Sequence, residues 1–110
     1  MIILYYVFIK GTLYKYRQMS AFSVLDISNT FHRFTQLVHL LPTKPNDDDL
    51  LCLYGYYKQS TLGDCMISRP TGLFDFKEKK KWDAWNGKKG MKKEESMKNY
   101  IDKVKQLMDH

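Results

Sequence analysis

The sequence predicts an all-α protein, a bundle of four short helices in a single domain. Two observations predict this fold class. From Ser28 onward, apolar residues recur at intervals of three and four, which is the period of an amphipathic helix. No stretch alternates apolar and polar residues with the period of two that a half-buried strand shows. Because 110 residues leave room for about one domain, the helices are expected to share one core.

The first two predicted helices are separated by prolines. One face of the first helix holds Phe31, Phe34, Val38 and Leu41. Pro42 and Pro45 end this helix, because proline lacks the amide hydrogen that a helix interior needs. Asn46 can cap the second helix, whose first turn holds aspartates 47–49, where the helix dipole favours negative charge. We expect this second helix to end at Gly63-Asp64.

The last two predicted helices follow a long connection. Pro70 and Gly72 mark residues 65–72 as this connection. Asp75 can cap a third helix from about Phe76 to Asn86, with Gly87 or Gly90 beyond its end. The last helix has the clearest period, formed by Met97, Tyr100, Ile101, Val104, Leu107 and Met108.

Residues 1–27 precede the predicted bundle and are expected to form an N-terminal extension. They open with the apolar run IILYYVFI, whereas a membrane span needs roughly 20 residues. The basic residues follow this run, which is the reverse of a secretory signal, although residues 20–23 resemble a cleavage region. We expect the extension to be disordered or weakly amphipathic. A weak membrane or targeting element is the alternative.

The charge of the chain favours an anionic partner. Lysine plus arginine number 18 and aspartate plus glutamate 12, so the net charge is +6. Phosphates, nucleic acid and lipid surfaces all suit such an excess. Cys52 and Cys65 are too few for a disulfide scaffold and suit a reducing compartment. The three histidines show no metal-binding spacing with them. We therefore expect no metal site and no cofactor.

Aromatic and lysine residues on the second and third helices form the candidate site. Tyr54, Tyr57 and Lys58 share one helix face, where lysine can contact a phosphate and the tyrosine rings a flat base. The alternative is two core tyrosines beside a surface lysine. Trp82 and Trp85 are three apart and are expected to pack in the core, next to a lysine run that suits either solvent or an anion.

No catalytic motif is present. The chain has no GxSxG, Walker or GxGxxG sequence. Cys52 lies in the apolar stretch Leu-Leu-Cys-Leu, which is typical of packing rather than of an activated thiolate. We therefore expect a binding protein and not an enzyme.

Four segments of the chain resemble the acyl-CoA-binding protein family. YGYYKQSTLGD at 54–64 is similar to the family's YxxYKQAT-x-GD signature, and KWDAWN at 81–86 resembles another family segment. TKP at 43–45 and MKNYIDKV at 97–104 also resemble family sequences, in the same order. The resemblance covers about residues 28–108, so residues 28–110 are identified as an acyl-CoA-binding domain.

This resemblance implies a fold, a ligand and a set of ligand residues. The fold is an up-down-down-up four-helix bundle, and the ligand is a long-chain fatty acyl-CoA. Its 3′-phosphoadenosine end is held by tyrosines and lysines, and its acyl chain lies in an apolar groove. The residues that match the nucleotide and phosphate contacts are Tyr54, Tyr57, Lys58, Lys81 and Tyr100. Leu50 and Leu51 match positions that contact the acyl chain.

The chain departs from the family pattern at three places. His39 aligns with a lysine of the first helix, and neutral histidine would weaken one phosphate contact. The connection from Arg69 to Asp75 is one residue longer than usual. Residues 1–27 have no counterpart.

Two other functions stay open at this point. A nucleic-acid-binding module would also explain the charge, and a thioesterase would act on the same ligand. The favoured prediction is a cytoplasmic, monomeric carrier or buffer of acyl-CoA that binds no nucleic acid and does not insert stably in a membrane.

Overall fold

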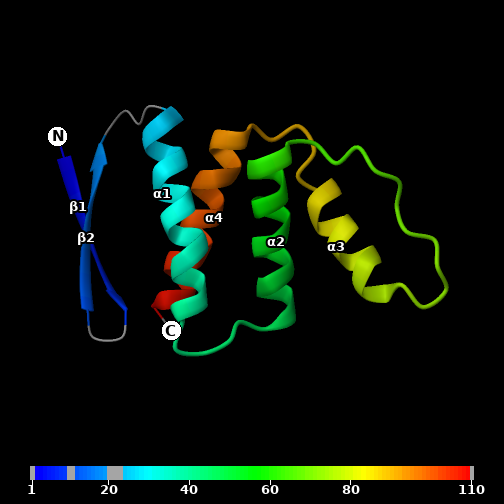
Figure 1. The fold of residues 1–110 in the computed structure, drawn as a ribbon, viewed down its shortest axis with the longest axis horizontal. Coiled ribbons are helices and arrows are strands. Elements are labelled where there is room, and N and C mark those ends of the chain that lie inside the picture. Colours follow the sequence, from blue (N-terminus) through cyan, green and yellow to red (C-terminus); the bar gives the residue numbers. More distant parts are fainter. Residues whose placement is uncertain (1, 10–11, 20–23, 110) are drawn as a thin grey trace.

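A computed structural model describes the backbone of residues 2–9, 12–19 and 24–109, and the side chains of residues 26–109. Its four helices are α1 (Val24–Leu37), α2 (Asp47–Leu62), α3 (Phe76–Asn86) and α4 (Lys93–Met108). The four predicted helices are therefore confirmed. Figure 1 shows that α1 and α4 run in one direction and α2 and α3 in the other, which is the expected up-down-down-up topology.

Helix α1 ends earlier than its apolar pattern indicated. Its last residue is Leu37, and a 3-10 turn, η1 (Val38–Leu40), follows. Leu41 has φ −60° and ψ 137°, which is extended backbone. Proline disfavours the helical conformation of the residue that precedes it, so Pro42 accounts for this extended residue. Of the four residues predicted on one face, Phe31 and Phe34 lie inside α1 and are fully buried.

The capping residues explain most of the other helix ends. The side chain of Asn46 accepts a hydrogen bond of 2.8 Å from the amide of Asp49, as predicted for the start of α2. Gly63 follows α2 with φ 80°, a left-handed conformation that favours glycine. Gly87 follows α3 as expected. Asp75 precedes α3, but its side chain makes no capping hydrogen bond, so that part of the prediction is wrong.

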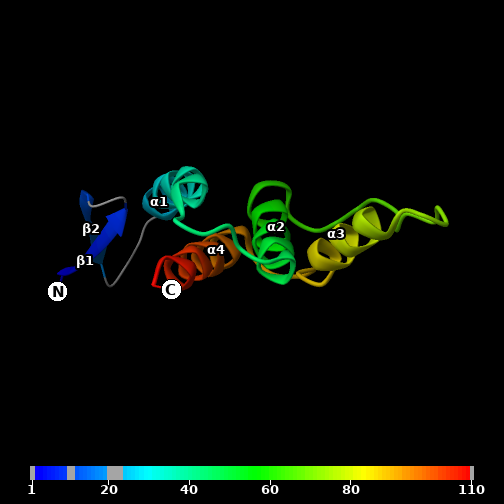
Figure 2. The same ribbon diagram turned by 90° about the horizontal axis from the view of Figure 1, so that it is seen from below.

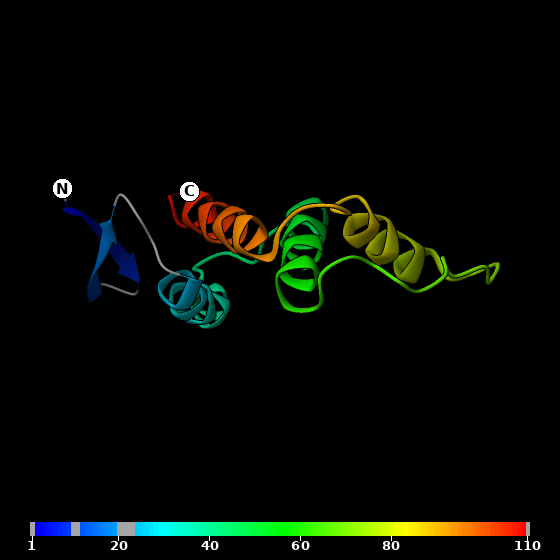
Figure 3. The ribbon, with the colours of Figure 1, turned by 90° about the horizontal axis from the view of Figure 1, so that it is seen from above.

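The core lies between α1, α2 and α4. Helix α4 packs against both α1 and α2, whereas α3 packs mainly against α2. Figure 2 and Figure 3 show this arrangement, with α3 on the outer side of α2. The buried residues of the core are Ile27, Phe31, Phe34, Leu37, Leu53, Tyr100, Ile101 and Val104. In α1 and α4, the buried core residues are thus apolar residues that recur with the helical period.

Polar contacts fix α2 on α4 and on the segment before α4. Buried Ser96 donates a hydrogen bond of 2.8 Å to the carbonyl of Tyr56. Lys103 forms an ion pair of 2.7 Å with Asp49 in the first turn of α2. The buried amide of Gln59 donates to the carbonyl oxygen of Met91 over 2.8 Å. These contacts fix the position of α2 along the bundle axis relative to α4.

Two strands precede the bundle. β1 (Ile2–Ile9) and β2 (Thr12–Met19) pair in antiparallel fashion, with Ile2 opposite Met19 and Ile9 opposite Thr12. β1 approaches α4, and the two strands lie at one end of the molecule (Figure 1). Residues 1, 10–11, 20–23 and 110 lie outside the described residues, so the cleavage-like segment 20–23 has no structural outcome here.

The strands were not predicted. The sequence favoured a disordered or weakly amphipathic extension, whereas isoleucine, valine and aromatic residues, which fill β1, are the types that favour strands. Helix α1 also begins at Val24, ahead of the expected boundary at Ser28. Whether residues 1–27 are separable from the bundle stays a prediction. Within the described ranges, no helix combines the length and the apolarity that are needed to cross a membrane.

Candidate functional site

Two lysine ammonium groups converge on the ring of Tyr54. Lys58 lies one turn further along α2, and its Nζ is 6.0 Å from the centroid of this ring. Lys81 comes from α3, and its Nζ is 5.0 Å from the same centroid. Since α2 and α3 pack side by side (Figure 1), the fold brings together two cations that are 23 positions apart in the chain. Tyr54, Lys58 and Lys81 are all half-buried.

Lys58 also contacts the ring of Trp85. The Lys58 Nζ is 4.8 Å from the centroid of the Trp85 ring, a cation–π distance. Trp85 is 6% exposed, and its Nε1 donates a hydrogen bond of 2.8 Å to the carbonyl of Gly63. The predicted core packing of Trp85 is confirmed. The same ring also borders the candidate site, which its spacing alone could not show.

The two lysines differ in their ion-pair partners. Lys81 Nζ is 3.8 Å from a carboxylate oxygen of Glu78, one turn earlier in α3, and the Lys81 side chain is 32% exposed. Lys58 contacts aromatic rings and forms no ion pair with a carboxylate among the described residues. Aromatic faces hold an ammonium group without neutralising its charge. The pair therefore keeps positive charge for an anion such as a phosphate.

A second aromatic cluster joins α1, α2 and α4. The ring of Phe31 stacks on Tyr57 at 6.0 Å and meets Tyr100 edge-on at 5.1 Å, and the two tyrosine rings are 6.4 Å apart. Tyr57 is 43% exposed, whereas Tyr100 is 4% exposed and belongs to the core. Burial and the neighbouring Tyr57 raise the pKa of Tyr100 to about 12. Tyr100 therefore stays protonated near neutral pH, and Tyr57 presents a ring toward solvent.

The remaining predicted site residues are not joined to these clusters. His39 lies in η1 and is exposed. Leu50 and Leu51 lie near the start of α2 and are half-buried. Among residues 26–109, no hydrogen bond, ion pair or ring contact links His39 to Lys58 or Lys81. The structure thus brings five predicted residues together in two clusters, one between α2 and α3 and one between α1, α2 and α4, and leaves these three apart.

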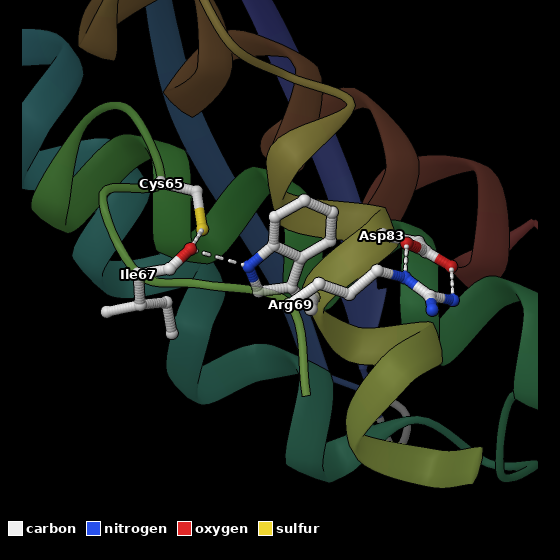
Figure 4. A network of polar contacts seen from close by, with 5 residues as sticks. Cys65, Ile67, Arg69 and Asp83 are labelled. Atoms are coloured by element: carbon white, nitrogen blue, oxygen red, sulfur yellow. Dashed lines mark hydrogen bonds and ion pairs between the residues drawn. The ribbon is translucent and has the colours of Figure 1, made fainter. Parts of the chain in front are cut away.

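The connection between α2 and α3 is fixed along α3. The Nε1 of Trp82 donates a hydrogen bond of 2.8 Å to the carbonyl of Ile67, which is labelled in Figure 4. Arg69 donates two hydrogen bonds of 2.9 Å to the carboxylate of Asp83. This pairing lowers the pKa of Asp83 and raises that of Arg69. Trp82 is half-buried, so its predicted core role is only partly met.

The Arg69–Asp83 pair was missed by the sequence analysis, because nothing in a single sequence links residues so far apart. It holds the connection that leads from α2 into α3. The part of the chain that the structure describes contains no group of three or more histidine, cysteine or acidic residues that could hold a metal ion.

The chain is similar to acyl-CoA-binding proteins in sequence. The family model for acyl-CoA-binding protein matches residues 28–104. An acyl-CoA-binding protein of Gossypium hirsutum is 47% identical over 85 residues, which cover 77% of this chain and 94% of the relative. One of Brassica napus is 44% identical, again over 77% of this chain and 91% of the relative.

Solved structures agree with the sequence comparison. The crystal structure of Oryza sativa acyl-CoA-binding protein 2 matches with a TM-score of 0.70 and 43% identity, over 76% of this chain and 91% of that one. The solution structure of the yeast acyl-coenzyme A binding protein matches with a TM-score of 0.60 and 43% identity, over 74% of this chain and 94% of that one. The chain belongs to the acyl-CoA-binding protein family, which confirms the resemblance and the four-helix bundle fold.

Proposed function

We propose that this chain binds long-chain fatty acyl-CoA thioesters without catalysis and carries or buffers them in the cytoplasm as a monomer. The observation that supports this most directly is the pair Lys58 and Lys81, held by two different helices with both ammonium groups within 6.0 Å of the Tyr54 ring centroid. Two cations beside an aromatic face suit a phosphorylated nucleotide. Coenzyme A presents such a nucleotide at one end of the ligand.

The proposed ligand uses both clusters and the start of α2. Its 3′-phosphate is contacted by Lys58 and Lys81, and its adenine lies against Tyr54 or the exposed ring of Tyr57. Tyr100 supports Tyr57 from the core. The acyl chain covers Leu50 and Leu51, which are half-buried and therefore offer apolar surface. Each CH₂ that leaves water contributes about 0.8 kcal/mol, so the apolar end adds to the phosphate contacts.

The proposal excludes turnover of the ligand. A thioesterase needs an activated nucleophile or a general base at the thioester carbonyl. The two thiols are half-buried Cys52 within α2 and buried Cys65 after it. Lys103, a basic residue close to Cys52, is paired with Asp49 over 2.7 Å, and the sulfur of Cys65 is 3.8 Å from the carbonyl of Ile67. Incubation of palmitoyl-CoA with the protein should release no free thiol above the rate in buffer.

Calorimetric titration tests the proposed function. Palmitoyl-CoA should bind with one site per chain and much more tightly than free coenzyme A or free palmitate, because only the thioester offers both the phosphates and the acyl chain. A series of chain lengths then gives the preferred acyl group. Equal binding of palmitate and palmitoyl-CoA would contradict the phosphate site. Single-stranded RNA is the comparison ligand, since tight binding that falls steeply with salt would favour a nucleic-acid module.

A further inference from the structure

Large apolar side chains are exposed where the connection from α2 enters α3. Leu73 is 76% exposed, Phe74 82% and Phe76 64%. We call residues 73–76 the apolar tip. Single apolar residues on a surface need no explanation, but several together mark an interaction site. None of these three side chains belongs to the core or to the two aromatic clusters described above.

The apolar tip is presented by a fixed part of the structure. Its connection is held along α3 by the Arg69–Asp83 pair and by the hydrogen bond from Trp82 to Ile67. Figure 1 shows that this connection forms the end of the molecule opposite the strands, and Figure 3 shows it projecting beyond α3. The tip can therefore reach a flat surface before the rest of the bundle does.

Lysines follow the apolar tip directly. Lys77 and Lys80 are exposed, and Lys79 is half-buried with its Nζ 5.9 Å from the ring centroid of Phe76. Residues 73–81 contain four lysines and two acidic residues, Asp75 and Glu78, so their net charge is 4 − 2 = +2. Glu78 is the carboxylate beside Lys81. The tip thus combines exposed apolar side chains with an excess of positive charge.

We propose that the apolar tip docks this chain peripherally on an anionic lipid surface. Leu73, Phe74 and Phe76 enter the boundary between headgroups and acyl chains, and the following lysines contact the anionic headgroups. Interfacial binding of this kind scales with buried apolar area and with attraction to anionic lipids. A protein partner is less well matched, because a stable interface buries about 800 Å² on each side, and three side chains on a projecting turn offer only a part of that area.

Co-sedimentation with lipid vesicles tests this proposal in the absence of acyl-CoA. The full chain should bind vesicles of phosphatidylcholine with about 30% phosphatidylserine and bind pure phosphatidylcholine vesicles several-fold more weakly. Leu73→Gln combined with Phe74→Gln should lower the partition coefficient about tenfold or more. Lys77→Gln combined with Lys80→Gln should lower it about tenfold on the anionic vesicles and little on the neutral ones.

Leu62→Gln is the matched control. Leu62 is also an exposed apolar residue, at 59%, but it ends α2 away from the tip, so its replacement should leave vesicle binding unchanged. Circular dichroism should show that all these variants fold, since each changes an exposed side chain. The proposal is overturned if the unaltered chain does not bind anionic vesicles at low salt, which would leave the tip to a protein partner. It is also overturned if the Leu73 and Phe74 variant binds as the unaltered chain does.

Discussion

Gly55 of α2 lies directly against the carbonyl group of Ala84 in α3. A Cβ atom added to Gly55 would be 2.5 Å from the Ala84 oxygen, which is closer than a real Cβ contact allows. The obstacle is backbone, so it cannot turn aside as a side chain would. Gly55 follows Tyr54 in the chain and Ala84 precedes Trp85. This close approach therefore sets the spacing of the two helices at the height of the proposed phosphate site.

Gly55→Ala should separate α2 from α3. The steric cost of overpacking is typically about 1–3 kcal/mol, and it outweighs the gain of about 1 kcal/mol that alanine gives in a helix. We expect a net loss of up to about 2 kcal/mol in the free energy of unfolding and a weaker affinity for palmitoyl-CoA. Urea unfolding and calorimetric titration measure the two effects. A variant that is more stable than the original chain would show that helix propensity dominates and that the contact is not limiting.

Lys58→Ala or Lys81→Ala should each weaken palmitoyl-CoA binding by roughly 1.5–3 kcal/mol, the range for hydrogen bonds to charged groups. The melting temperature should change little, because half-exposed lysines contribute little to folding. Lys88→Ala is the matched control, since its Nζ also lies on a tyrosine ring, 4.2 Å from the centroid of Tyr56, but outside the proposed site. If Lys88→Ala weakened palmitoyl-CoA binding as much, the losses at Lys58 and Lys81 would reflect the overall positive charge of the chain and not a specific site.

His39 should make the affinity depend on pH if it replaces the lysine that the family pattern has at this position. An imidazolium attracts a phosphate and a neutral imidazole does not, so affinity should rise as pH falls from 8 to 6. His39→Lys should bind at least as well at pH 8 and flatten this dependence. The phosphate itself also titrates near pH 6, so the measurement is the difference between the original chain and His39→Gln. Identical pH profiles would place exposed His39 outside the site.

Truncation from the N-terminus should have different effects when the chain is cut at the start of α1 and when it is cut inside α1. A chain of residues 24–110 keeps all of α1 and should fold and bind palmitoyl-CoA normally. A chain of residues 28–110 lacks Ile27, which is 7% exposed in the core, so its free energy of unfolding should fall by about 2–5 kcal/mol. Thermal unfolding and titration of both chains check this. Loss of cooperative unfolding in the longer one would show that β1, which approaches α4, belongs to the core.

Tyr100→Phe should make the free energy of unfolding fall less at alkaline pH. The pKa of Tyr100 is raised to about 12 by burial and by Tyr57, whereas an unfolded tyrosine has a pKa of about 10. Between these values the unfolded chain releases a proton that the folded chain keeps, so the free energy of unfolding falls as pH rises. A difference of about two units corresponds to about 2–3 kcal/mol. Urea unfolding at pH 8 and pH 11.5 should show a smaller decrease for the variant than for the original chain.

Local sequence patterns predicted the four helices but did not predict the two strands before them or the contacts between helices. Asn46 and the apolar period of α4 are local features, and both appear in the structure as expected. Strand β1 was missed because a continuous apolar run does not distinguish a strand from other buried segments. Gly11, which follows the apolar run in the sequence, was a turn signal that could have indicated a hairpin.

The sequence predicted which residue types form the candidate site more fully than it predicted how these residues are arranged. Tyr54 and Lys58 are one helical turn apart, so their shared face follows from the sequence. Lys81 joins them only because α2 and α3 pack together, which the family resemblance implied and the spacing could not. The spacing of Trp82 and Trp85 indicated one shared role, yet Trp85 is buried beside Lys58 while Trp82 binds the connection before α3. Such differences depend on packing between elements far apart in the chain.

The contact between Lys58 and Trp85 gives this chain an optical reporter of its own. Indole emission responds to the electric field around the ring, and the Lys58 ammonium lies 4.8 Å from the Trp85 centroid. An anion that draws this ammonium toward itself changes the field at a tryptophan that is otherwise shielded from water. We therefore expect the intrinsic fluorescence of Trp85 to change when an anion occupies the proposed phosphate site, without any attached label.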